Sequence, residues 1–148
     1  MGDKLKILFL CTGNSCRSQM AEGWAIHLKS KSIEAYSAGV EPHGMNKLAV
    51  QVMKEADVDI SGHHSKHVDE LKGVEFDYVV TVCDHANETC PLFPGKTKVI
   101  HVGFDDPPRR AKEAKSQEEA LGHYRRVRDE IRHFIQNIES YLPVSSRA

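Results

Sequence analysis

The chain has 148 residues, of which 40% are hydrophobic and 28% are charged, as expected for one globular domain with a substantial core. The formal net charge of −1 argues against a general nucleic-acid or anionic-membrane binder, which would carry a large basic excess. We expect neither a secretory leader nor a membrane span, because no apolar run is long enough. Four cysteines in such a chain indicate reduced, functional thiols in the cytoplasm rather than a secreted disulfide framework.

Short apolar runs alternate with helix-like stretches along the chain. We expect strands at 5–10, 35–40, 77–82 and 98–102, and helices at 19–31, from 46 to about 56 and at 120–142. Residues 61–71 are polar and contain at most a short helix, and the charged residues 109–119 form a solvated loop or a helical lead-in. This order predicts an α/β fold: one domain over 1–142 with a four-stranded parallel sheet and helices on both faces, and a frayed tail at 143–148.

Three chemically distinctive segments begin where predicted strands end. They are Cys11, Cys83 and the pair Asp105 and Asp106. In open parallel sheets, ligands bind beyond the carboxyl ends of the strands. The sequence therefore predicts one site to which these segments contribute.

The loop after the first predicted strand reads CTGNSCRS, residues 11–18, and opens a helix. Backbone N–H groups at such a helix start bind anions, and Arg17 can grip a tetrahedral oxyanion with two parallel hydrogen bonds. The same groups would lower the pKa of Cys11 and keep it a thiolate nucleophile, with Ser18 donating a hydrogen bond to it. The alternative is a buried structural cysteine before an ordinary helix start. The predicted oxyanion-binding residues are Thr12, Gly13, Asn14, Ser15, Cys16, Arg17 and Ser18, with Cys16 mainly a packing residue.

Residues 11–24, CTGNSCRSQMAEGW, resemble the phosphate loop of the low-molecular-weight protein tyrosine phosphatase fold, which includes the thioredoxin-coupled arsenate reductases. The resemblance continues through 36–39, 43–44, 59–61, 79–81, 103–107 and 126–131, and so covers nearly the whole chain in order. It implies the fold predicted above and an enzyme that attacks an oxyanion with Cys11.

Two further cysteines, Cys83 and Cys90, distinguish a reductase from a phosphatase, because only a reductase must dispose of two electrons. The resemblance implies a Cys11–Cys83 disulfide that passes to Cys83–Cys90 and is then reduced by thioredoxin. A regular helix over 83–90 would separate its end Cα atoms by more than about 10 Å, whereas a disulfide needs about 7 Å or less. We therefore expect this segment to loop out or unwind when its cysteines pair. Cys83 could instead be a small buried apolar residue or, with His85 and Cys90, part of a zinc site, although a fourth ligand is not evident at typical spacing.

The general acid of this family precedes a proline, as Asp106 precedes Pro107. The resemblance implies that Asp106 protonates the departing hydroxide and first takes a proton from Cys11. Asp105 is the second candidate, and a plain turn at these residues is the alternative.

A cluster of three histidines invites a metal hypothesis, but no cysteine or carboxylate pattern completes it, and a solvated polar segment is expected instead. Its members are His63, His64 and His67. The resemblance also implies a monovalent-cation site, for which Asn14, Glu22 and Ser37 match, but Lys66 stands where an aspartate is usual. We expect the ammonium group to replace the cation, with weak or absent activation by potassium.

The sequence as a whole predicts a monomeric arsenate reductase that uses no metal or organic cofactor. Its expected partners are arsenate, with phosphate or sulfate as mimics, and thioredoxin, but no nucleic acid or membrane. The alternatives are a low-molecular-weight protein tyrosine phosphatase and a non-enzymatic thiol or arsenite sensor.

Overall fold

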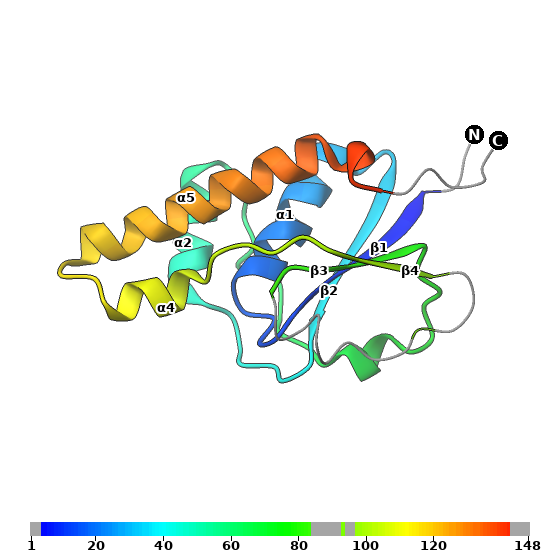
Figure 1. Ribbon diagram of the computed structural model, residues 1–148, viewed down its shortest axis with the longest axis horizontal. Coiled ribbons are helices and arrows are strands. Elements are labelled where there is room, and N and C mark those ends of the chain that lie inside the picture. Colours follow the sequence, from blue (N-terminus) through cyan, green and yellow to red (C-terminus); the bar gives the residue numbers. More distant parts are fainter. Residues whose placement is uncertain (1–3, 84–92, 94–96, 143–148) are drawn as a thin grey trace.

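The structure, a computed structural model, describes residues 4–83, 93 and 97–142 (Figure 1). Four strands form one parallel sheet in the order β2-β1-β3-β4. They are β1 (Leu5–Cys11), β2 (Ile33–Gly39), β3 (Tyr78–Thr81) and β4 (Lys98–His101). The predicted α/β class with a four-stranded parallel sheet is confirmed.

Strand β1 lies at the centre of the sheet because it can be buried on both faces. Residues 7–10 are Ile, Leu, Phe and Leu, and none of them is exposed. Such a continuous apolar run is typical of a parallel strand covered on both sides. The register pairs Cys11 with Gly39 of β2 and Leu10 with Thr81 of β3, so the ends of three neighbouring strands meet at one edge of the sheet.

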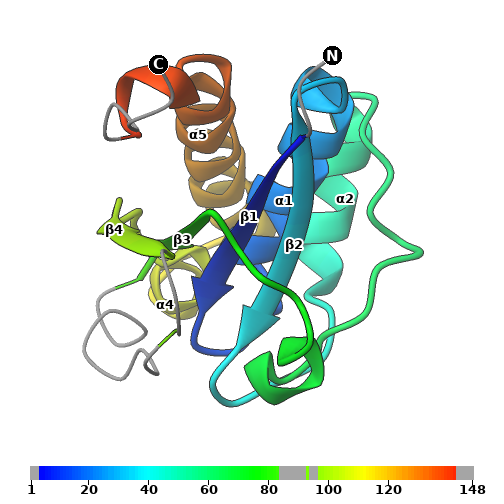
Figure 2. The same ribbon diagram turned by 90° about the vertical axis from the view of Figure 1, so that its right-hand side faces the viewer.

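Among the described residues, α-helices cover one face of the sheet, and a chain segment crosses the other (Figure 2). Helices were predicted on both faces, and on the second face the described residues contain only a short 3₁₀ helix. α1 (Arg17–Lys29) packs against β1 and β2, and α5 (Gln117–Gln136) packs across α1, α2 (Lys47–Glu55) and α4 (Pro107–Lys112). On the opposite face, the segment from the 3₁₀ helix η1 (Val68–Leu71) to β3 places Phe76 edge-on to Tyr36 of β2. A last 3₁₀ turn, η2 (Ile138–Ser140), follows α5. Among the described residues, no helix has the length and apolarity needed to cross a membrane.

Helix starts differ from the sequence prediction in two places. α1 begins at Arg17, so Ser18 lies inside the helix rather than before it. The charged stretch 109–119 follows the helical of its two predicted alternatives, but α5 begins at Gln117 rather than at 120. Pro107 occupies the first turn of α4, and Ser116 caps α5 by accepting a hydrogen bond from the N–H of Glu119 at 3.1 Å. Proline at a helix start and serine at an N-cap are local signals that a reading of apolar periodicity alone misses. Residues 143–148, the expected tail, lie outside the described part of the chain.

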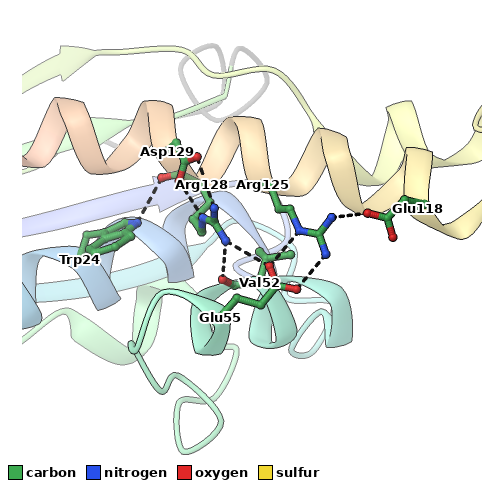
Figure 3. Close-up of polar contacts among 7 residues, drawn as sticks. All are labelled: Trp24, Val52, Glu55, Glu118, Arg125, Arg128 and Asp129. Atoms are coloured by element: carbon green, nitrogen blue, oxygen red, sulfur yellow. Dashed lines mark hydrogen bonds and ion pairs between the residues drawn. The ribbon is translucent and has the colours of Figure 1, made fainter.

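Charged side chains join α5 to α2 at the solvent side of this layer (Figure 3). Arg125 binds both carboxylate oxygens of Glu55 at 2.9 Å, and Arg128 donates to the carbonyl of Val52 at 2.9 Å. The indole N–H of Trp24 in α1 donates to the carbonyl of Arg128 at 3.2 Å. These bonds fix the positions of α1 and α2 relative to α5.

Candidate active site

A pocket of about 1150 Å³ opens at the carboxyl ends of β1, β3 and β4. The strand-end segments predicted from the sequence all reach it: Cys11 from β1, Cys83 after β3, and Asp105 and Asp106 after β4. The pocket is far larger than one tetrahedral oxyanion. Three basic side chains that the sequence reasoning did not select also line it, namely His43, Arg109 and Lys112. His43 follows the end of β2. It could have been predicted, because ligands bind beyond the carboxyl ends of the strands in a parallel sheet.

The loop from Cys11 to Ser18 wraps from the end of β1 into the first turn of α1. Asn14 is fully buried and has a φ of 48°, a left-handed conformation that asparagine tolerates better than most residues. Gly39 of β2 lies so close that a Cβ atom there would be 2.6 Å from the carbonyl oxygen of Thr12 and 2.9 Å from the nitrogen of Asn14. The end of β2 therefore packs directly against the loop backbone, and there is no room for a side chain at Gly39.

The Asn14 side chain is a centre of hydrogen bonding within the loop. Its Nδ2 donates to Ser18 Oγ at 2.8 Å, and its Oδ1 accepts from Gln19 Nε2 and from the backbone N–H of Lys66, both at 3.0 Å. The Ser18 hydroxyl thus accepts from Asn14, and a hydroxyl that accepts one hydrogen bond can still donate another. Donation from Ser18 to the Cys11 sulfur remains a prediction.

Arg17 turns toward the loop after β4. Its Nη1 donates to the carbonyl of Phe104 at 2.9 Å, and its Nη2 lies 3.7 Å from Asp106 Oδ2. The guanidinium group is mostly buried, with 13% of the side chain exposed. This places a fixed positive charge in the pocket, next to the carboxylate that the sequence proposed as the acid.

The thiols of Cys11 and Cys83 share a hydrogen bond, and both side chains are buried. Thr12 Oγ1 lies 3.2 Å from Cys83 Sγ and so fixes the position of the second thiol. The shared hydrogen bond and burial raise the pKa of the Cys11 thiol well above its ordinary value, although Arg17 and the Thr12 N–H act in the opposite direction. The expectation of a Cys11 thiolate at neutral pH is therefore wrong for this pair of reduced thiols, because it ignored Cys83.

Cys16 is the buried N-cap residue of α1. Burial raises the pKa of this thiol, and the positive charge of Arg17 offsets only part of the effect. A thiol that stays protonated in the core is inert, since the thiolate is the reactive form. Its position supports the packing role that was predicted for it.

The two aspartates after β4 have different surroundings. Asp105 binds Arg126 at 2.6 Å and Arg110 at 2.9 Å, and these bonds lower its pKa to about 2. Asp105 also accepts the backbone N–H of Asp106 at 3.0 Å. A carboxylate held ionised by two arginines cannot supply a proton near neutral pH, so Asp106 is the better candidate acid and Asp105 positions it.

Cys90 and the residues expected to loop out between it and Cys83 lie outside the described residues. Of the three histidines, His63 contacts Gln19 Oε1 at 3.1 Å, and His67 caps η1 by accepting the N–H of Asp69. Within the described ranges, no group of three or more histidine, cysteine or carboxylate side chains could hold a metal ion.

Comparison with known proteins gives matches over nearly the whole chain. The family model of the low molecular weight phosphotyrosine protein phosphatases matches residues 6–144. Arsenate reductase 2 of Staphylococcus saprophyticus is 49% identical over 129 residues, covering 87% of this chain and 92% of the relative. An arsenate reductase of Staphylococcus aureus is 45% identical over 137 residues, covering 93% and 98%. The solved arsenate reductase of Archaeoglobus fulgidus is 29% identical, with a TM-score of 0.71 over 90% of this chain and 98% of that one.

Proposed function

Because the chain belongs to the low molecular weight phosphotyrosine protein phosphatase family and its relatives at 45–49% identity are arsenate reductases, we propose that it reduces arsenate to arsenite. The observation that carries this proposal is the direct contact between the Cys11 and Cys83 thiols inside an oxyanion pocket. A phosphatase needs one nucleophilic sulfur, whereas a reductase needs a second sulfur at bonding reach to collect two electrons.

The first step binds arsenate in the loop 12–18, against Arg17 and the backbone N–H groups at the start of α1. Cys11, after losing its proton to Asp106, attacks the arsenic atom. One oxygen then leaves as hydroxide, and Asp106 returns the proton so that water departs. The product is an arsenic(V) thioester on Cys11.

Reduction occurs in the second step. Cys83 gives up its proton, which the departing arsenite takes up, and the resulting thiolate attacks Cys11 Sγ. The sulfur–arsenic bond breaks, and its electron pair stays on arsenic, which leaves as arsenite. The two sulfurs are oxidised together to a Cys11–Cys83 disulfide, so the two electrons balance. The contact of Thr12 Oγ1 with Cys83 Sγ at 3.2 Å supports this step, because it keeps the second sulfur next to the loop.

The third step restores the loop. Cys90 attacks Cys83, which releases Cys11 as a thiol and leaves a Cys83–Cys90 disulfide. A dithiol reductant, for which we propose thioredoxin, reduces this disulfide by exchange. Such a cycle requires the thiol-reducing conditions of the cytoplasm, and no step requires a metal or an organic cofactor.

The test is arsenate-dependent oxidation of NADPH in the presence of thioredoxin and thioredoxin reductase, with arsenite measured in parallel. The wild type should turn over continuously, and Cys90→Ser should release one equivalent of arsenite and stop. A phosphatase would hydrolyse p-nitrophenyl phosphate, would not need Cys83 and would produce no arsenite. An arsenite sensor would bind arsenite tightly without needing Arg17 or Asp106. Phosphate ester hydrolysis without arsenite production would reject the reductase proposal, and so would tight arsenite binding that needs neither Arg17 nor Asp106.

A further inference from the structure

The segment 63–67 is hydrogen-bonded to the phosphate loop at two points and to the start of α1 at a third. The backbone N–H of Lys66 donates to Asn14 Oδ1 at 3.0 Å, and Ser65 Oγ donates to the carbonyl of Gly13 at 2.9 Å. Gln19, in the first turns of α1, donates to the carbonyl of His64 at 3.1 Å. The position of this segment therefore determines the position of the loop's two central residues.

The side chain of Lys66 holds this segment in place. Its Nζ donates to the carbonyl of Ser37 in β2 at 3.0 Å and to the carbonyl of His64 at 3.2 Å. The backbone of the same residue continues the pairing, because its carbonyl accepts the N–H of Gly39 at 2.9 Å. One half-buried lysine thus joins the end of β2, the segment 63–67 and, through Asn14, the phosphate loop.

The oxygens around this ammonium group are those that a monovalent cation would use. The family likeness implies such a cation, with Asn14, Glu22 and Ser37 among its ligands. Here the Ser37 carbonyl binds the Lys66 ammonium, the Ser37 hydroxyl donates to Glu22 at 2.5 Å, and Asn14 Oδ1 already accepts two hydrogen bonds. A free cation on the same carbonyl would lie within a few ångströms of a fixed positive charge, and the two would repel. The residues of this chain therefore do not fit a bound monovalent cation.

We propose that Lys66 is a positioning residue, a tethered cation that holds the phosphate loop in its anion-binding form without potassium. The lysine supplies the positive charge from within the chain, so the loop needs no ion from solution. This proposal requires only that the loop binds an oxyanion, and it does not depend on arsenate being the substrate.

The test compares wild type, Lys66→Met, Lys66→Arg and the control Lys72→Met, whose lysine is exposed. The dissociation constant of inorganic phosphate from each reduced protein is measured by calorimetry in choline, sodium and potassium chloride at one ionic strength, together with the thermal midpoint. Wild type, Lys66→Arg and the control should bind phosphate equally in all three salts. Lys66→Met should bind about tenfold more weakly in choline chloride, since it loses a charged hydrogen-bond donor. Potassium should restore its affinity and raise its midpoint, because the vacated carbonyls can then bind the ion.

Each other outcome overturns the inference in a different way. A potassium-specific gain in the wild type would mean that the cation site works despite Lys66. Normal binding by Lys66→Met in choline chloride would mean that Lys66 does not position the loop. Weak phosphate binding by Lys66→Met in every salt would mean that Lys66 has a merely structural role. If Lys66→Met does not fold, loss of phosphate binding by the folded Lys66→Arg would have the same meaning. Failure of the wild type to bind phosphate would instead contradict the premise that the loop binds an oxyanion.

Discussion

The structure assigns different tasks to two adjacent aspartates, and the matched substitutions Asp105→Asn and Asp106→Asn separate them. Asp106 lies 3.7 Å from Arg17 at the pocket, whereas Asp105 binds Arg110 and Arg126. If Asp106 is the proton donor, its conversion to asparagine should lower kcat about 10²–10⁴-fold with little change in stability. Asp105→Asn keeps a side-chain oxygen for the N–H of Asp106, so kcat should fall by less than about tenfold.

The stability change expected for Asp105→Asn follows from its pKa. A carboxyl whose pKa falls from 3.8 to about 2 on folding stabilises the folded state by at most about 2 kcal/mol at neutral pH. The side chain is 27% exposed, and solvent screening reduces this to about 1 kcal/mol. Because the folded-state pKa is the lower one, the stabilisation is complete above about pH 4 and is lost as the pH falls toward 2. The difference between Asp105→Asn and wild type should therefore shrink over that window.

Two measurements on each variant decide the assignment. Single-turnover release of arsenite reports the chemical step, and urea unfolding at pH 7 and pH 3 reports stability. A large loss of kcat in Asp105→Asn with nearly normal turnover in Asp106→Asn would reverse the two roles. A stability difference that is the same at pH 7 and pH 3 would refute the argument from the arginine contacts.

Three further substitutions test other parts of the structure. Cys83→Ala should abolish arsenite release and lower the pKa of Cys11, because it removes the side chain whose hydrogen bond raises that pKa while Arg17 remains. The pH dependence of Cys11 alkylation, followed by mass spectrometry, should shift to lower pH, and an unchanged profile would contradict this. Gly39→Ala should abolish phosphate binding in a folded protein, as checked by calorimetry and circular dichroism, because its Cβ would meet the loop backbone at 2.6 Å. Arg128→Met should destabilise the protein by about 1–2 kcal/mol in urea without changing kcat, since it loses hydrogen bonds to α2 far from the pocket.

The sheet and the meeting of its strand ends were predictable because they depend on local pattern and on one general rule. The run at residues 7–10 is apolar throughout, and a strand of this kind belongs inside a parallel sheet. Parallel strands place their carboxyl ends together, so Cys11, Cys83 and Asp106 were expected to converge before any distance was known. Helix starts were less predictable, since Arg17 and Pro107 begin helices through backbone geometry that apolar periodicity does not report.

The electrostatics of the site were beyond sequence reasoning because they depend on which side chains meet. The loop around Cys11 contains groups that lower a thiol pKa, and that part of the reasoning was sound. The direction of the pKa shift of Cys11 reversed because Cys83, which lies 71 positions from Thr12 in the sequence, places a second thiol next to Cys11. The distinction between Asp105 and Asp106 likewise rests on Arg126, which a chain-order reading does not connect to either residue.

The contact between the two thiols has opposite consequences at the two ends of the proposed cycle. Before substrate binds, the shared hydrogen bond keeps Cys11 protonated, and a protonated buried thiol resists oxidation. Once Cys11 has passed its proton to Asp106 and bonded to arsenic, it can no longer donate to Cys83. Cys83 then retains the Thr12 hydroxyl as its partner, and a hydroxyl that donates to sulfur favours the thiolate. The same proximity thus keeps Cys11 protonated at rest and lets Cys83 attack it after the first step. In the proposed cycle, disulfide formation therefore starts only after an oxyanion has bound.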